Sequence, residues 1–137
     1  MTGAVFDTGP LVAALDRRDS RHEECAAFLS SFIGRRLLPV TVMTEVCWMF
    51  EEWPDIEAAF LDAVASGSFE LVRLEDADIQ RMSELVRQYG DFPLGATDAS
   101  VIAVAERLDL RHVATLDHRH FRAIKPKHTD ALTLLPL

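Results

Sequence analysis

The chain has 137 residues, and 49% of them are hydrophobic, which is enough for one compact domain with its own core. Its formal net charge of −8 disfavours non-specific binding to nucleic acid and suits a basic partner, although a selective RNA substrate is not excluded. No apolar run approaches the roughly 20 residues that span a bilayer, so no membrane segment is expected.

In the first part of the chain, apolar runs are followed by segments with helical periodicity. Residues 4–6 predict a buried strand, and Thr8 is a plausible cap for the helix that follows it. Ser20 is expected to cap a second helix, because Glu23 completes a capping-box pattern three residues later. The apolar face of this helix is expected to include Ile33.

The rest of the chain continues this alternation. The expected strands lie at 37–40, 69–72, 113–115 and 133–135, and the expected helices lie at 41–53, 55–65, 75–89 and 97–108. The stretch 118–122 is expected to be a solvated loop. Short apolar strands that alternate with helices predict a single α/β domain, with a central parallel sheet flanked by helices.

The cysteines and the start of the chain indicate the compartment. Cys25 and Cys47 fall in helix-patterned segments and match no zinc spacing, so they are expected to be small core residues in a reducing cytosol. Residues 1–7 have no basic region and no long apolar region, which disfavours a signal peptide. A cytoplasmic protein is therefore expected.

Four acidic residues lie among apolar neighbours or directly after an expected strand: Asp7, Glu45, Asp98 and Asp117. An unpaired buried carboxylate is costly, so four that converge would require cations. The C-terminal edge of a parallel sheet is also where α/β proteins place their ligands. The sequence thus predicts a hard-metal site with oxygen ligands, and such a site most often serves phosphoryl chemistry.

Each acid also has a purely structural interpretation. Asp7 could form a turn or cap a helix, and Asp98 could cap its own helix. Glu45 could pair with an arginine, and Asp117 could be a turn residue. Taken together, the four favour a metal cluster.

The motifs that contain these acids carry a family resemblance. They are VFDTGPLVA at 5–13, TEV at 44–46, DFPLGATDASVIA at 91–103 and ATLDHRHF at 114–121. With these motifs in this order, the chain resembles the PIN-domain ribonucleases and, more closely, the VapC-type toxins of type II bacterial toxin–antitoxin pairs. The resemblance implies one PIN domain over 1–137 with a Rossmann-like fold, a Mg²⁺ or Mn²⁺ cofactor, cleavage of structured RNA such as tRNA or rRNA, a homodimer and an inhibitory antitoxin.

Carried over to this chain, the resemblance assigns metal binding and catalysis to Asp7, Glu45, Asp98 and Asp117. Thr8 and Thr115 would hold carboxylates or the scissile phosphate through their hydroxyls, although either could equally be a cap or strand residue. Asp91 matches a recurrent acid of the subgroup, but its loop position reads more simply as a turn, so it is at most a supporting residue.

Other segments have expected roles in binding. Arg119 and Arg122 are expected to contact RNA phosphates from the loop beside the active edge, and a salt-bridged surface loop is the alternative. Trp48, Phe50 and Trp53 are expected in the core or in a dimer contact rather than as a base-stacking platform. An antitoxin helix is expected in a groove between the early helices at 11–28 and the helix at 42–53.

Two other classes of function fit a metal site on such a sheet. One is another Mg²⁺-dependent phosphoryl enzyme, such as a DNA flap nuclease or a phosphatase, although an aspartyl-phosphate phosphatase would have two nearby aspartates where 7–9 has one. The other is a non-catalytic receiver-like signalling module, which would have a lysine at the strand end where Asp117 stands.

Overall fold

The computed structural model of the protein describes residues 2–137, which form a five-stranded sheet and seven helices. The strands are β1 (Gly3–Phe6), β2 (Arg35–Pro39), β3 (Glu70–Val72), β4 (His112–Ala114) and β5 (Thr133–Leu135). The helices are α1 (Thr8–Leu15), α2 (His22–Ser31), α3 (Val40–Met49), α4 (Pro54–Ala65), α5 (Asp76–Gln88), α6 (Ala96–Arg107) and α7 (His118–Ala123). The predicted α/β fold with a central parallel sheet is confirmed.

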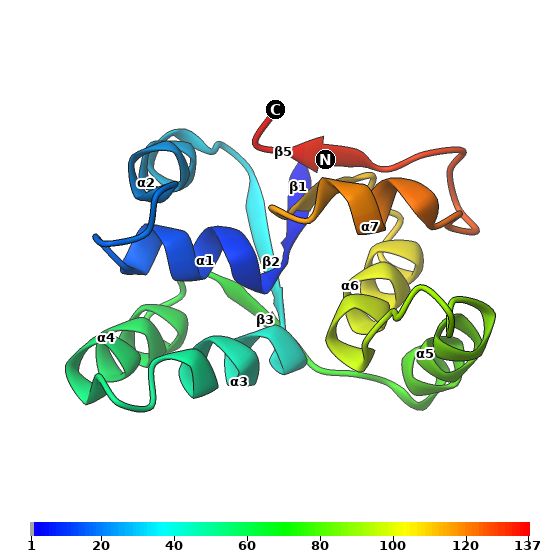
Figure 1. The fold of residues 1–137 in the computed structure, drawn as a ribbon, viewed down its shortest axis with the longest axis horizontal. Helices are drawn as coiled ribbons and strands as arrows, with labels where there is room; N and C mark the ends of the chain where they lie inside the picture. Colours follow the sequence, from blue (N-terminus) through cyan, green and yellow to red (C-terminus); the bar gives the residue numbers. More distant parts are fainter. Residues whose placement is uncertain (1) are drawn as a thin grey trace.

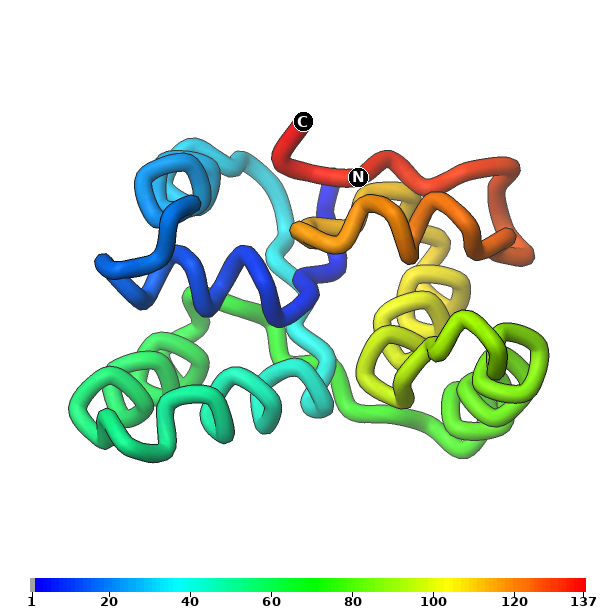
Figure 2. The backbone as a smooth tube through the Cα atoms, viewed as in Figure 1, coloured from blue at the N-terminus to red at the C-terminus, as the bar shows by residue number. Residues whose placement is uncertain are grey.

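The sheet has the order β3-β2-β1-β4-β5, and all its pairings are parallel, with Val5 opposite both Leu37 and Val113. The chain first runs outward from β1 to β3 and then returns to β4 and β5. Helices α1 to α4 cover one side of the sheet and α5 to α7 the other (Figure 1), as right-handed crossovers in opposite directions require. Figure 2 follows the connection from β3 to α5, which carries the chain between the two sides. The strand order therefore reverses between β1 and β4, which is a topological switch point.

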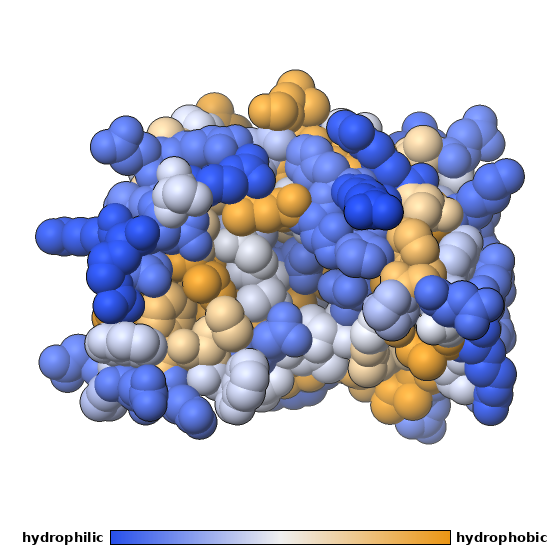
Figure 3. Space-filling model, in the orientation of Figure 1, coloured by the Kyte–Doolittle hydropathy of each residue, from blue (hydrophilic) through white to orange (hydrophobic). Residues whose placement is uncertain are grey.

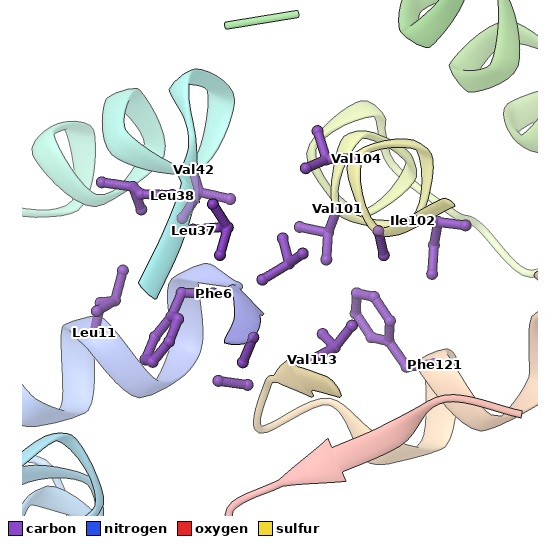
Figure 4. Close-up of a cluster of buried hydrophobic side chains, with 14 of the residues drawn as sticks. Phe6, Leu11, Leu37, Leu38, Val42, Val101, Ile102, Val104, Val113 and Phe121 are labelled. Atoms are coloured by element: carbon purple, nitrogen blue, oxygen red, sulfur yellow. The ribbon is translucent and has the colours of Figure 1, made fainter. Parts of the chain in front are cut away.

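The core lies on both faces of the sheet. Every residue of β1 is buried, because this central strand is covered by helices on both sides. Figure 4 shows Phe6 and Leu11 on the side of α1, and Ile102 and Phe121 on the side of α6. Helix α6 is itself buried along 99–105, since it packs between the sheet and α5.

Ion pairs between α5 and α6 close the outer side of this layer. Asp78 is 3% exposed, and it accepts from Arg107 Nε at 3.0 Å while it completes a capping box at the start of α5. Arg81 Nε donates to Glu106 at 2.8 Å. These charge-assisted bonds satisfy polar groups that would otherwise be costly to bury, so α6 is fixed from both sides.

The predicted start of the second helix was wrong. Helix α2 begins at His22 with Arg21 rather than Ser20 at its N-cap, because the carboxylate of Asp19 accepts the backbone N–H of Arg21 at 2.8 Å and holds this segment in a turn. Ile33 lies beyond the end of α2 and is 90% exposed, so it does not belong to an apolar helix face.

Two further predictions were wrong at the edges of the cleft described below. Helix α3 ends at Met49 rather than at 53. Trp48 and Trp53 are 67% and 40% exposed, so neither indole lies in the core, whereas Phe50 is buried as expected. The alternative role of the two indoles in a dimer contact stays a prediction. The stretch 118–122 is part of helix α7 rather than a loop. The carboxylate of Asp117 caps α7 by accepting the backbone N–H of His120 at 3.2 Å, and Phe121 anchors it in the core.

The cysteines are free thiols, Cys25 buried and Cys47 half-buried, and burial raises the pKa of both. In the described part of the chain, no helix is long and apolar enough to cross a membrane.

Candidate metal centre

The switch point places two of the predicted acids side by side. Asp7 follows β1 and Asp117 follows β4, and these two strands are hydrogen-bonded neighbours. The backbone N–H of Asp7 donates to Ala114 O at 2.8 Å, which extends the pairing up to the acid itself. Both carboxylates therefore lie at the C-terminal edge of the sheet, as the sequence predicted.

The hydroxyl of Thr115 connects the two sides of the switch point. It donates to Asp7 Oδ2 at 2.8 Å and accepts the backbone N–H of Asp117 at 3.0 Å, and Thr115 is fully buried. A buried hydroxyl with both roles satisfied fixes its partners strongly. The orientation of the Asp7 carboxylate is thereby tied to the loop that carries Asp117.

Gly9 leaves little space for a side chain against the loop after β4. A Cβ on Gly9, in the first turn of α1, would lie 3.2 Å from both Cβ and Cγ of Leu116, closer than ordinary van der Waals contact. The absence of a side chain at Gly9 lets α1 begin directly against the loop after β4.

Glu45 and Asp98 reach this edge from two helices that start close together. Thr41 Oγ1 in α3 lies 2.6 Å from Ser100 Oγ in α6, and Ser100 in turn donates to Thr97 O at 2.6 Å. This hydrogen-bonded chain holds the first turns of α3 and α6 against each other.

The four predicted acids line one cavity of ≈ 440 Å³. Its walls are Asp7, Thr8, Gly9, Glu45, Met49, Asp98, Leu116 and Asp117. Within residues 2–137, no group of three or more His, Cys, Asp or Glu side chains is already arranged as the shell of a metal ion.

Burial and the neighbouring carboxylates raise the pKa values of two acids in the cavity, Asp98 and Asp7. Burial, followed by the charges of Asp7, Asp117 and Glu45, raises the pKa of Asp98 to about 7. Burial also raises the pKa of Asp7, although hydrogen bonds from Thr115 and from the backbone of Thr8 oppose this. Carboxylates that crowd one partly buried cavity repel one another unless a cation balances their charge, and an all-oxygen anionic set of this kind fits a hard divalent cation. The donor set therefore fits Mg²⁺ or Mn²⁺.

Thr8 presents an unsatisfied hydroxyl to the same cavity. Its Oγ1 is buried and has no hydrogen-bond partner within residues 2–137, and the residue is only 8% exposed. Thr8 is not the helix cap, because the N-cap position of α1 belongs to Asp7. A buried, unpaired hydroxyl in a polar cavity is suited to bind a ligand oxygen.

Sequence reasoning missed His120 as part of the site. Its ring Nδ1 forms a short hydrogen bond with Asp117 Oδ2, its backbone N–H donates to the other carboxylate oxygen, and the edge of Phe92 packs on the ring with centroids 4.8 Å apart. His120 thus fixes the orientation of the Asp117 carboxylate. The sequence signal for this contact was that His120 follows Asp117 by three residues. That spacing brings the two side chains together only if a helix begins at 118.

The remaining predicted residues lie outside the cavity walls. Asp91 lies in an exposed turn between α5 and α6. Arg119 and Arg122 are exposed on one side of α7, one turn apart, and neither forms an ion pair within residues 2–137.

The sequence of this chain is similar to that of a known protein family and of one named relative. A sequence model of the PIN domain family matches residues 4–126. Ribonuclease VapC26 of Mycobacterium tuberculosis is 28% identical over 134 residues, which cover 96% of this chain and 99% of that protein.

Solved structures share the fold at low sequence identity. A toxin–antitoxin complex from Klebsiella pneumoniae matches with a TM-score of 0.72 and 20% identity, over 95% of this chain and 99% of the other. Mycobacterium tuberculosis VapC20, described as a sarcin-ricin loop cleaving toxin, matches with a TM-score of 0.75 and 14% identity, over 82% of this chain and 87% of the other. VapBC2 from Rickettsia felis, bound to a DNA fragment from its promoter, matches with a TM-score of 0.69 and 14% identity, over 97% of each chain.

Proposed function

The chain belongs to the PIN domain family, and from this premise we propose that it is a metal-dependent endoribonuclease of the VapC toxin type. The observation that carries the proposal is the convergence of four carboxylates on one cavity at the switch point of the sheet. The similarity to a protein named ribonuclease VapC26, over nearly the full length of both chains, supports the same activity.

Each residue of the cavity has a role in this proposal. Asp7 and Asp98 bind Mg²⁺ or Mn²⁺ most directly, and Glu45 and Asp117 complete the shell directly or through water. When bound, the ion would lower the pKa of a coordinated water and would stabilise charge on the phosphodiester. Glu45 or Asp117 orients or deprotonates the attacking water.

The two threonines hold the reacting groups. The Thr115 hydroxyl keeps the Asp7 carboxylate aimed into the cavity. The Thr8 hydroxyl, which has no partner in residues 2–137, is free to donate to a non-bridging oxygen of the scissile phosphate.

The proposed substrate is structured RNA, such as tRNA or rRNA. Cleavage of the sarcin-ricin loop is described for VapC20, which shares the fold of this chain. Selective recognition of a structured RNA also suits a protein with a net charge of −8, because non-specific attraction to phosphate is weak. Sequencing of RNA ends after brief expression would identify the target.

Metal removal tests the activity. The purified protein is expected to cleave total RNA at few positions in Mg²⁺ or Mn²⁺, and EDTA is expected to stop cleavage until the metal is restored in excess. Gel analysis of the fragments measures this. RNA cleavage that continues unchanged in EDTA would contradict the proposed metal centre.

The exposed arginines of α7 are proposed to bind RNA phosphates beside the cleft. Arg119→Ala and Arg122→Ala are each expected to weaken RNA binding and to reduce the slope of log affinity against log salt by about 1, because each lost phosphate contact retains its counterions. Binding to a cleavage-inactive variant over a salt series measures the slope. Arg17→Ala, also exposed but beyond the far end of α1, is the matched control and should keep the wild-type slope. An unchanged slope in both α7 variants would show that this helix does not contact RNA.

We propose that a basic antitoxin covers the cleft. The Klebsiella pneumoniae neighbour is described as a toxin–antitoxin complex, and the acidic cavity of this chain suits an arginine or lysine from such a partner. An apolar groove of ≈ 390 Å³ is available for a partner helix, lined by Leu11, Ala14, Leu15, Ala26, Leu29, Ser30, Arg36, Ala59, Phe60, Ala63 and Phe69. On the face in Figure 3, hydrophobic residues gather between α1 and the helices α3 and α4.

This groove differs from the one that the sequence predicted, and which of the two an antitoxin helix would occupy stays a prediction. Its second wall is formed by α4, at 54–65, rather than by the helix at 42–53, because α3 leans against α1 and α6 instead. The homodimer that the resemblance implies stays a prediction.

A further inference from the structure

A second cavity adjoins the metal-centre cavity. It has a volume of ≈ 370 Å³, and its walls are Thr41, Thr44, Glu45, Trp48 and Thr97. Glu45 lines both cavities, so its side chain is the wall they share. Trp48 follows Glu45 by three residues in α3 and Met49 follows it by four, and these two side chains extend the walls of the second and the first cavity. A group in the second cavity would therefore lie next to a phosphate in the first.

Trp48 is unusually open for a tryptophan. It is 67% exposed, and within residues 2–137 its indole takes part in no ring contact, cation–π contact or hydrogen bond. Trp53, in contrast, lies under the guanidinium of Arg18, 4.9 Å from the ring centroid. An indole with a free face is a stacking surface for another flat ring.

The other walls are polar but carry no positive charge. Thr44 directs its hydroxyl hydrogen to backbone oxygens of its own helix, 2.9 Å from Thr41 O. Thr41 can direct its hydroxyl hydrogen to Ser100 Oγ, 2.6 Å away, because Ser100 donates to Thr97 O. Both hydroxyl oxygens are then left as acceptors. The carboxylate of Glu45 also accepts, and it would repel a phosphate.

We propose that this cavity is a nucleobase subsite, in which a base of the RNA next to the scissile phosphate stacks on Trp48 and donates hydrogen bonds to the threonine oxygens. The inference rests on the proposed ribonuclease function. A neutral planar ring with N–H donors matches an indole face with acceptor walls, whereas a phosphate or an acidic peptide does not. Trp48 then contributes to the choice of the cleaved position, because the base in this cavity fixes which phosphate reaches the acids.

A second copy of the chain is the competing occupant. Among the described residues of α3, the exposed large hydrophobic side chains are Trp48 and Met49, so a stable dimer, which needs roughly 800 Å² from each partner, would have to draw most of its interface from other elements. The continuity with the metal-centre cavity through Glu45 instead favours an extended substrate that occupies both.

Affinity for RNA tests the subsite. Trp48→Ala is expected to weaken binding of a single-stranded RNA by about 10- to 100-fold, because loss of one base–aromatic stack has this effect in other proteins. Trp48→Phe, which keeps a ring, is expected to recover most of the affinity and the wild-type cleavage positions. Trp53→Ala is the matched control and should leave affinity unchanged. All variants are compared after their folding has been checked by circular dichroism.

Fluorescence gives a direct readout of stacking. The chain has two tryptophans, so Trp53→Phe leaves Trp48 as the only indole. In this background, with Asp98→Asn added to prevent cleavage, short RNAs in Mg²⁺ are expected to quench the emission saturably. With Trp48→Phe instead, the remaining Trp53 should not respond.

The outcomes separate the inference from the function on which it rests. Equal RNA affinity of wild type and Trp48→Ala, with normal RNA cleavage by both, overturns the subsite and leaves the ribonuclease standing. A change from dimer to monomer in Trp48→Ala, without a change in RNA affinity, assigns Trp48 to an interface between copies and also overturns it. Failure of the wild type to cleave or bind any RNA overturns the proposed function, and the subsite with it.

Discussion

Asp98→Asn is expected to reduce metal-dependent RNA cleavage by about 100-fold or more, because the substitution removes a carboxylate oxygen that is proposed to bind the metal ion. The fold should be retained. Asn has nearly the same shape as Asp, and the neighbouring residues 99–105 are held by the core rather than by the carboxylate. Asp7→Asn is expected to lose cleavage for the same reason.

The same substitution should stabilise the protein when no metal is bound. The pKa of Asp98 in the fold, about 7, lies above its ordinary value of 3.8, so the ionised carboxylate opposes folding. This penalty is fully present above pH 7 and fades as the pH falls toward 4. Since the side chain is partly exposed, we expect a gain of about 1–2 kcal/mol for Asp98→Asn at pH 8, or a few degrees in Tm.

Two measurements check these opposite effects. Cleavage of RNA in Mg²⁺ gives the loss of activity, and thermal unfolding in EDTA at pH 8 and pH 5 gives the gain in stability and its decline. Asp62→Asn, on the exposed side of α4, is the control and should change neither. A folded Asp98→Asn protein that cleaves at the wild-type rate would remove Asp98 from the metal centre.

Ala63→Glu is expected to produce a toxin that its antitoxin no longer restrains. Ala63 lies on α4 in the wall of the apolar groove, where a glutamate would put an unpaired charge against the partner helix. Burial of such a charge at an interface typically costs several kcal/mol, which is a loss of more than about 100-fold in affinity. The catalytic cavity has no residue in common with this groove, so nuclease activity should persist.

Growth and copurification measure this effect. Expression of the wild type alone is expected to arrest growth, and coexpression with its genomic neighbour is expected to restore growth and yield a complex. Ala63→Glu should arrest growth in both cases, whereas Ala58→Glu, exposed on the same helix outside the groove, should behave as wild type. Equal restraint of Ala63→Glu and wild type would place the antitoxin elsewhere. Harmless expression of an active nuclease would remove the toxin assignment alone.

The sequence located the acids because strand ends and helix starts are local features. Asp7 and Asp117 follow apolar runs that could only be buried strands, so their position at one edge of the sheet was predictable. The order of the strands in the sheet was not predictable, because the sequence does not show on which side of the preceding strands each new strand is added. The bridge from Thr115 to Asp7 spans 108 positions in the chain and exists only once β1 and β4 are neighbours.

The errors have equally physical causes. Helix α7 has six residues, too few for a hydrophobic period, and its cap is the same Asp117 that was interpreted as a ligand or a turn residue. The exposure of Trp48 could not be read from periodicity, since the pattern shows which residues share a face but not what covers that face. His120 was overlooked because its contact with Asp117 requires that unpredicted helix.

The two helices that line the cleft, α6 and α3, differ in how many amino-acid substitutions they can tolerate. Residues 99–105 of α6 have no solvent-facing side, so almost any substitution there would leave a void or force the core apart. Helix α3 presents Thr44, Trp48 and Met49 to solvent, where replacements cost little stability. Helix α6, which carries Asp98, thus tolerates few substitutions, whereas the exposed side of α3 tolerates many. With the function proposed above, descendants of this chain could change which RNA they recognise through mutations in α3, without altering the acidic centre that would cut it.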